Sequence, residues 1–206
     1  MADTTRSGST GRTGAERVKA AAALMGAWVA LLWLLEAVDL VTGHALDAYG
    51  ISPREAVELR DLVPAAFLHF GFGHVAANTV PLLVFGFLAA LGGIRRFLAV
   101  AALIVVVDGL GVWLVSPAHS VTAGASGLIF GLFGYLLVRG FVDRKPIDIV
   151  VGLLIGAIWG STVLLGVSPT QSGVSWQGHL FGLLAGVAAA FVFRRHRPRA
   201  AAPLTV

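Results

Sequence analysis

Two residues in apolar stretches of this sequence have the chemistry of a nucleophile and a base. Ser126 stands in the run Gly124-Ala125-Ser126-Gly127 where one apolar stretch begins, and His179 stands near the start of another. An imidazole within hydrogen-bond reach of a serine hydroxyl can remove its proton and later return it to a leaving amine. If the two stretches pack together, the pair predicts a Ser-His dyad, because no carboxylate is well placed as a third member. A helix cap or a small packing residue is the alternative interpretation of Ser126.

His74 and Asn78 form a second polar pair in an apolar stretch. Residues four apart lie on one face of a helix, so the two side chains can donate convergent hydrogen bonds. An oxyanion in a tetrahedral intermediate needs such donors, and free N–H groups at the start of the helix that carries Ser126 can add to them. Taken alone, the pair could equally make hydrogen bonds between membrane helices.

The elements that must position these residues are membrane helices. Of the 206 residues 57% are apolar and only 13% are charged, whereas soluble domains are about a quarter charged. A water-soluble fold of this size has too little interior for so many apolar side chains. The absence of cysteine excludes disulfides and thiolate chemistry. His-Glu-x-x-His is also absent, and we expect no metal or other cofactor.

Six apolar segments have about the ~20 residues that cross a bilayer. They lie at roughly 20–41, 74–92, 97–116, 125–142, 147–166 and 176–193. The sequence thus predicts an all-α membrane protein, a six-helix bundle over residues 20–193. A disordered tail (1–19) would precede it and a basic tail (194–206) would follow it. The polar leader and Glu36 favour an uncleaved first span over a signal peptide.

The distribution of Lys and Arg predicts the orientation. Basic residues gather in 1–19, 95–96, 139–145 and 194–199, and the opposite side of the predicted membrane has only Arg54 and Arg60. The positive-inside rule then places both termini in the cytoplasm and the four polar residues at one shallow depth on the other side. This placement of the basic residues also argues against nucleic-acid binding as the reason for the high isoelectric point. Apolar and charged residues alternate in the connection 42–73, which we expect to lie in the membrane interface.

These motifs together resemble the signature of rhomboid intramembrane serine proteases. The resemblance covers roughly residues 50–193 in the family's order, and the ordered set is far more specific than any one motif. It is carried by Gly124-Ala125-Ser126-Gly127, His74-x-x-x-Asn78, Gly178-His179-x-x-Gly182 and the run Phe67-Leu68-His69-Phe70-Gly71-Phe72-Gly73-His74.

The resemblance implies a role for each matched residue. Ser126 would be the nucleophile and His179 the base. His74, Asn78 and the Ser126 backbone N–H would surround the oxyanion. Gly124, Phe130 and His69 would support the site. Phe130 stands where the family often has a tyrosine stacked on the catalytic histidine; phenylalanine can stack but has no hydroxyl. The connection 167–175 would be a flexible cap, and the fifth segment would flank a lateral opening for substrate.

The implied activity is cleavage of transmembrane segments near the non-cytoplasmic face of the cell membrane. The expected partners are transmembrane protein substrates and the lipid bilayer. Arg60 and Asp61 replace a Trp-Arg pair that many members have, which bears on how the first loop is anchored. We interpret Asp108 as a helix-packing or cytoplasm-distal polar contact.

An alternative function is a catalytically inactive rhomboid-like protein that binds client helices. Such relatives normally lack the serine or the histidine, and this sequence has both. A transporter is less favoured, because no inverted repeat or pair of broken helices is apparent.

Overall fold

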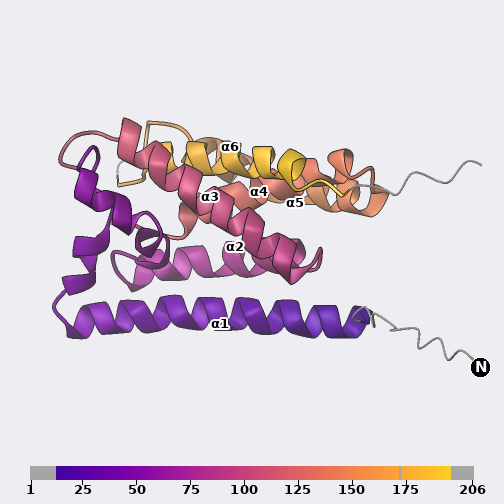
Figure 1. The fold of residues 1–206 in the computed structure, drawn as a ribbon, viewed down its shortest axis with the longest axis horizontal. Coiled ribbons are helices and arrows are strands. Elements are labelled where there is room, and N and C mark those ends of the chain that lie inside the picture. Colours follow the sequence, from indigo (N-terminus) through magenta and orange to yellow (C-terminus); the bar gives the residue numbers. More distant parts are fainter. Residues whose placement is uncertain (1–12, 172, 196–206) are drawn as a thin grey trace, which may run out of the picture.

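A computed structural model describes residues 13–171 and 173–195 as a bundle of helices (Figure 1). The α-helices are α1 (Gly14–Val41), α2 (Phe72–Ala90), α3 (Ile94–Val115), α4 (Ser126–Val142), α5 (Pro146–Gly166) and α6 (Trp176–Val192). Within the described ranges, β structure is limited to one bridge between Ile51 and Thr122. The predicted all-α fold is confirmed, and five of the six helices begin and end within three residues of the predicted segments.

The start of α1 differs from the prediction. The helix begins at Gly14, so residues 14–19 of the predicted tail are helical. The Thr13 hydroxyl accepts the Glu16 backbone N–H while the Glu16 carboxylate accepts the Thr13 backbone N–H. This capping box fixes the helix start six residues before the apolar segment. The rest of the predicted tail, residues 1–12, and residues 196–206 of the basic tail lie outside the described residues.

The helices differ in length and in surroundings. By length and composition α1, α2, α3 and α5 can cross a membrane, whereas α4 and α6 are apolar but have 17 residues each. Twelve of the 17 residues of α4 are buried, so protein surrounds this helix on most sides. A helix enclosed by others need not match the full thickness of the bilayer. Four of the six predicted spans are therefore long helices, and the other two, α4 and α6, are shorter.

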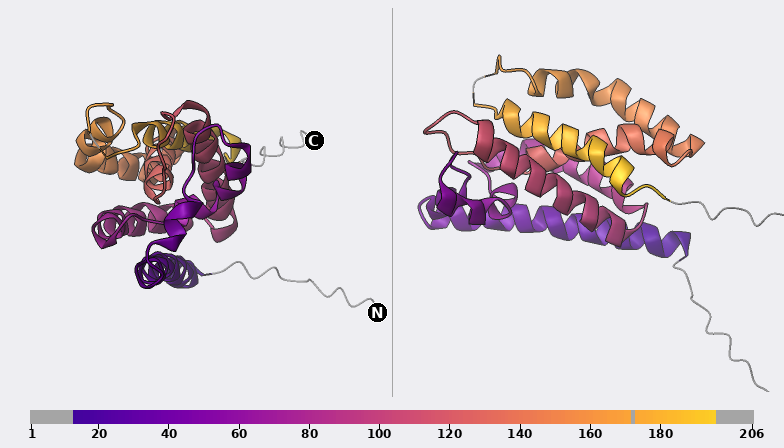
Figure 2. Two further views of the ribbon diagram at one scale, coloured as in Figure 1. Left: turned by 90° about the vertical axis from the view of Figure 1, so that its left-hand side faces the viewer. Right: turned by 45° about the horizontal axis from the view of Figure 1, so that its top comes forward.

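The helix α4 lies at the centre of the bundle, as an end-on view shows (Figure 2). It packs against α6, α5, α2 and α3, while α1 packs on the outside against α2. Leu128, Leu132 and Leu136 of α4 are completely buried in the main core. The outer helices α1 and α5 expose large apolar side chains such as Leu34, Ile158 and Leu164, as expected of surfaces that face lipid.

The connection from α1 to α2 crosses one end of the bundle (Figure 1). It contains three short 3₁₀ helices, η1 (Ala45–Tyr49), η2 (Ala56–Asp61) and η3 (Pro64–Phe67). The backbones of Ile51 and Thr122 exchange two hydrogen bonds, and the Gly124 N–H donates to the Ala65 carbonyl over 2.8 Å. The first loop therefore holds the segment that leads into Ser126.

The first loop is anchored without the Trp-Arg pair of many rhomboids. The Arg54 guanidinium donates to the Ser116 carbonyl over 2.9 Å, and the Trp113 indole N–H donates to the Glu55 carbonyl over 2.9 Å. At the two replaced positions, Arg60 is exposed and lies 3.4 Å from the buried carboxylate of Asp61. These bonds tie the loop to the C-terminal end of α3.

The start of α1 and the end of α6 lie at the opposite end of the bundle from this loop (Figure 1). There, the Arg96 guanidinium donates to the Asp143 carboxylate over 2.7 Å, and the Arg195 backbone N–H donates to its other oxygen. Burial opposes the charge of Asp143, but the hydrogen bonds from Arg96 and Arg195 hold its pKa below the usual range. Both described ends of the chain are thus on one side, as an even number of crossings requires.

Candidate active site

Each of the helices α4 and α6 carries two glycines one turn apart, Gly127 and Gly131 on α4 and Gly182 and Gly186 on α6. These two stripes of glycine face each other. A Cβ atom at Gly182 would lie 2.8 Å from the carbonyl carbon of Gly127, and one at Gly186 would lie 2.8 Å from the Cα of Gly131. Only glycine lets the two backbones approach this closely. Since Gly127 follows Ser126 and Gly182 lies one turn after His179, this contact brings the predicted nucleophile and base to the same end of the helix pair.

Ser126 is the first residue of α4 and is half-buried. The chain enters the helix through Gly124, whose φ of +138° suits glycine. A Cβ atom at Gly124 would lie 3.8 Å from the Ser126 hydroxyl and 3.0 Å from Nε2 of His74. Gly124 therefore leaves open the space between the serine hydroxyl and His74.

His179 is buried at the first turn of α6, and its ring is fixed from two sides. It stacks on Phe130 with 3.9 Å between the ring centroids and 12° between the planes. Its Nδ1 lies 2.9 Å from the Gly166 carbonyl oxygen. A carbonyl can only accept, so Nδ1 carries the hydrogen and Nε2 keeps a lone pair. This tautomer is the one that a general base needs.

The predicted serine and histidine share one cavity without a direct bond. Both line a cavity of about 790 Å³. Within residues 13–171 and 173–195, no hydrogen bond joins the Ser126 hydroxyl to the imidazole. Catalytic hydrogen bonds often tighten only when substrate binds, or pass through one water. Ser126 and His179 therefore line one cavity, and the dyad stays a prediction.

His74 and Asn78 line the same cavity from α2. The Phe70 backbone N–H lies 3.4 Å from Nδ1 of His74, which makes Nδ1 the acceptor and leaves a hydrogen on Nε2. Asn78 is buried, and its amide nitrogen has no hydrogen-bond partner in the described part of the chain. A buried amide donor without a partner is costly, so its N–H groups are available to a water or a ligand in the cavity. Both side chains present donors, as the oxyanion role predicts.

His69 supports this wall of the site from behind. Its ring is buried and meets the His74 ring edge-on, with 4.9 Å between centroids. Its Nε2 accepts the Ala125 backbone N–H over 3.4 Å, directly before Ser126. Burial, and then the neighbouring His74, lower the pKa of His69 to about 4. His69 is therefore uncharged near neutral pH and can keep accepting this bond.

The cavity extends between α2 and α5. Its walls include Val80 and Pro81 of α2 and Thr162 and Leu165 of α5. Phe85 of α2 and Trp159 of α5 meet edge-on at 5.2 Å and also line it.

The connection after α5 contributes lining residues. Gln171, Gly173 and Val174 belong to the predicted cap and border the cavity. These residues of the connection thus border the same cavity as Ser126 and His179.

Two contributors to the site were not predicted from sequence. The Gly166 carbonyl orients His179, and a Cβ at Gly166 would collide with the Phe130 ring. Asp108 was predicted as a helix-packing or cytoplasm-distal polar contact, and the structure adds that it lines the cavity. A Cβ at Gly178 would lie 3.0 Å from its Oδ1, and one at Gly127 would overlap Oδ2. The carboxyl thus occupies the space that the glycines beside Ser126 and His179 leave open.

Comparison with known proteins finds the same family along most of the chain. The rhomboid domain matches residues 56–196. A Mycobacterium tuberculosis protein named as uncharacterized is 45% identical over 173 residues, covering 80% of this chain and 72% of the relative. A Bacillus subtilis protein named rhomboid protease YdcA is 30% identical over 185 residues, covering 82% and 86%. Rhomboid protease GluP of the same organism is 33% identical over 130 residues, covering 63% of this chain and 25% of the relative.

Proposed function

The chain belongs to the rhomboid family, and on this basis we propose that it is an intramembrane serine endopeptidase with a Ser126–His179 dyad. The observation that carries the proposal is the state of His179. Its Nδ1 is committed to the Gly166 carbonyl and its ring is stacked on Phe130. In the described part of the chain Nε2 has no hydrogen-bond partner, and His179 lines a cavity that Ser126 shares. This is a base held in one orientation and one tautomer next to a half-buried hydroxyl.

In the proposed mechanism, Nε2 of His179 takes the Ser126 proton as the hydroxyl oxygen attacks a peptide carbonyl. The negative charge that develops on the carbonyl oxygen is stabilised by hydrogen bonds from His74 Nε2–H, the Asn78 amide and the Ser126 backbone N–H. The imidazolium then gives its proton to the leaving amine, and an acyl-enzyme remains. Water, deprotonated by the same nitrogen, releases the new carboxyl end and restores the serine.

The proposed substrates are transmembrane segments that reach the dyad between α2 and α5. Residues of both helices line the cavity, and most of them are apolar, as a lipid-embedded segment would require. A helix must unwind before its backbone can be attacked, which favours segments that are weakly helical near the membrane surface. Both termini of this protein would be cytoplasmic, in the cell membrane, with cleavage near the opposite face.

The test is cleavage of a single-span model substrate by purified protein. Ser126→Ala and His179→Ala are expected to abolish cleavage, and a fluorophosphonate should label the wild type but not Ser126→Ala. Ser161→Ala on the exposed face of α5 and His119→Ala in a loop are matched controls that should cleave normally. Thermal unfolding checks that each variant folds. Cleavage by Ser126→Ala at the wild-type rate would refute the dyad. An inactive wild type that binds the substrate would instead support the inactive client-binding alternative.

A further inference from the structure

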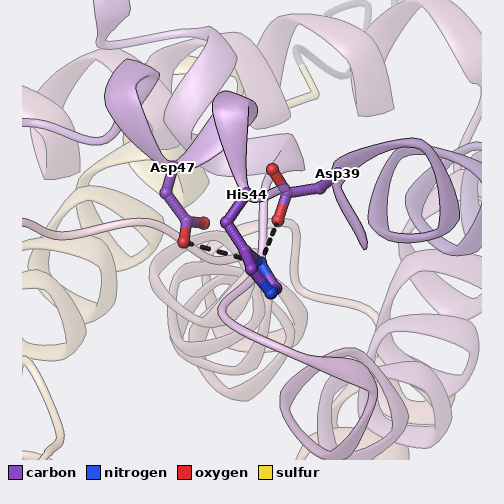
Figure 3. Close-up of side chains that lie close together, drawn as sticks. All are labelled: Asp39, His44 and Asp47. Carbon is purple, nitrogen blue, oxygen red and sulfur yellow. Dashed lines mark hydrogen bonds and ion pairs between the residues drawn. The ribbon is translucent and has the colours of Figure 1, made fainter. Parts of the chain in front are cut away.

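A group of carboxylates and one histidine lies where α1 ends and the first loop begins, away from the dyad. Asp39 is on the last turn of α1, His44 follows the helix and Asp47 is in η1 (Figure 3). Nδ1 of His44 lies 2.9 Å from Oδ2 of Asp39 and 3.9 Å from Oδ2 of Asp47. The three atoms lie within 4.8 Å of one another.

The spacing of these atoms fits a shared metal ion. Nitrogen and oxygen ligands bind Zn²⁺ at about 2.0–2.2 Å, so two ligands of one ion can be at most roughly 4.4 Å apart. Both distances from His44 are inside this limit. The Asp47 side chain, which is about one third exposed, can close any remaining gap by a small rotation.

Asp39, whose buried side chain is the least able to move of the three, is already oriented. The Asp39 side chain is buried, and its other oxygen, Oδ1, accepts the Leu46 backbone N–H over 2.7 Å. A second bond of this kind commonly fixes a metal ligand in place. His44 is half exposed, so an ion can reach the group from solvent.

A fourth carboxylate is an independent indication of a cation. Glu36 lies one turn before Asp39 on α1, is only 2% exposed, and its Oε2 has no hydrogen-bond partner among the described residues. It interacts electrostatically with all three members of the group. A buried carboxylate oxygen without a partner is costly unless a cation or donor satisfies it.

The charges of the four residues do not balance. Three carboxylates surround one imidazole, and in the described chain the charged groups that act on Glu36, His44 and Asp47 all belong to this set, with no Lys or Arg among them. We propose that Asp39, His44 and Asp47 bind a divalent transition-metal ion of the Zn²⁺ type, with Glu36 adding negative charge beside it. An imidazole ligand favours such ions over Ca²⁺ and Mg²⁺, which prefer oxygen. On binding, the imidazolium form of His44 releases its Nδ1 proton to solvent, the ion takes the place of that proton, and the neutral ring keeps its hydrogen on Nε2.

The ion would join α1 to the loop that supports the segment before Ser126. From η1 the chain runs directly to Ile51, which pairs with Thr122. A metal bound here would raise the stability of the protein, because it joins two elements at the end of the bundle where the candidate active site lies. It would take no part in the proposed chemistry.

The experiment titrates Zn²⁺ into metal-stripped full-length protein in detergent and follows heat of binding and thermal unfolding. We expect one equivalent to bind and the melting temperature to rise until that equivalent is filled, whereas Mg²⁺ has no effect. His44→Gln and Asp47→Asn should each weaken Zn²⁺ binding tenfold or more. His119→Gln is the matched control, since His119 is also an exposed loop histidine with a left-handed φ (65°, against 64° for His44).

The same titration can overturn the proposal. Binding that is equal in the wild type and in His44→Gln would assign the Zn²⁺ to another site, and absence of binding below millimolar Zn²⁺ would leave only an ion pair between His44 and Asp39. Melting of each variant without metal shows whether it folds. Binding to Ser126→Ala should be unchanged, so this result is independent of the proposed protease activity.

Discussion

Gly182→Ala tests whether the close contact of α4 and α6 positions the dyad. The added Cβ would lie 2.8 Å from the carbonyl carbon of Gly127, whereas carbon atoms pack at about 3.5–4.0 Å. The atoms it meets are backbone, so no side chain can turn away and the helices must separate by roughly 1 Å. Overpacking of this kind costs about 1–3 kcal/mol of stability. Because Gly127 adjoins Ser126, a 1 Å displacement of the dyad is expected to lower cleavage on the order of 100-fold.

The assay compares cleavage of one model substrate and thermal unfolding for Gly182→Ala and two control variants. Gly160→Ala on α5 and Gly26→Ala on α1 also add a methyl group to a glycine inside an apolar helix, but nothing lies within 4 Å of either new Cβ. Both should unfold at or above the wild-type temperature, since alanine favours a helix over glycine, and both should cleave normally.

The outcome separates packing from catalysis. If Gly182→Ala unfolds and cleaves like the wild type, the described contact between α4 and α6 is wrong. If it unfolds at a lower temperature yet cleaves at the full rate well below that temperature, the contact stabilises the bundle but does not position Ser126 and His179. The reasoning stands only if both properties fall together while the two controls keep them.

Three further changes probe the walls of the site. Phe130→Leu keeps an apolar side chain but removes the ring stacked on His179; since such stacking contributes about 0.5–1.5 kcal/mol, cleavage should fall about two- to tenfold, and an unchanged rate would argue against the stacking role. Asp108→Leu removes the one carboxyl among the described cavity residues, whose Oδ1 has no hydrogen-bond partner there. It should lower cleavage about tenfold, as for one lost hydrogen bond to a substrate or a water in the cavity, while Asp108→Asn keeps most of the activity. For His69, whose folded pKa is about 4, the unfolded state binds more protons between pH 6.5 and 4. Stability should therefore fall by at most roughly 3 kcal/mol as the pH drops through this window, and thermal unfolding of His69→Gln should show a shallower fall.

The helices could be predicted because apolar runs of membrane length leave few alternatives. The segment predicted over 176–193 became Trp176–Val192, and the two stretches that carry Ser126 and His179 pack together through Gly127, Gly131, Gly182 and Gly186. The early start of α1 had a signal in the sequence, the spacing of Thr13 and Glu16 in a capping box, but hydropathy alone does not detect it.

The orienting group of His179 could not be predicted in the same way. It is the backbone carbonyl of Gly166, and a backbone group has no side-chain pattern by which a sequence could reveal it. The position of Asp108 depends on how α3 is rotated against α4 and α6, since its carboxyl fits only where Gly127 and Gly178 leave room. Both depend on packing between segments far apart in the sequence, which periodicity within one segment does not determine.

There is a physical reason why the partner of the buried His179 is a backbone carbonyl and not a carboxylate. A carboxylate buried within the apolar bundle would lose its hydration, and the cost of several kcal/mol is recovered only with excellent pairing. The Gly166 carbonyl carries no charge, and it is held in place because Gly166 belongs to the last turn of α5. It can fix the ring and the tautomer of His179, although it stabilises the imidazolium less than a carboxylate would. The stacked Phe130 ring supplies part of that difference, because an aromatic face attracts a cation. On this reasoning, a movement of the C-terminal end of α5 would release Nδ1 of His179, so the position of α5 and the readiness of the proposed base are coupled.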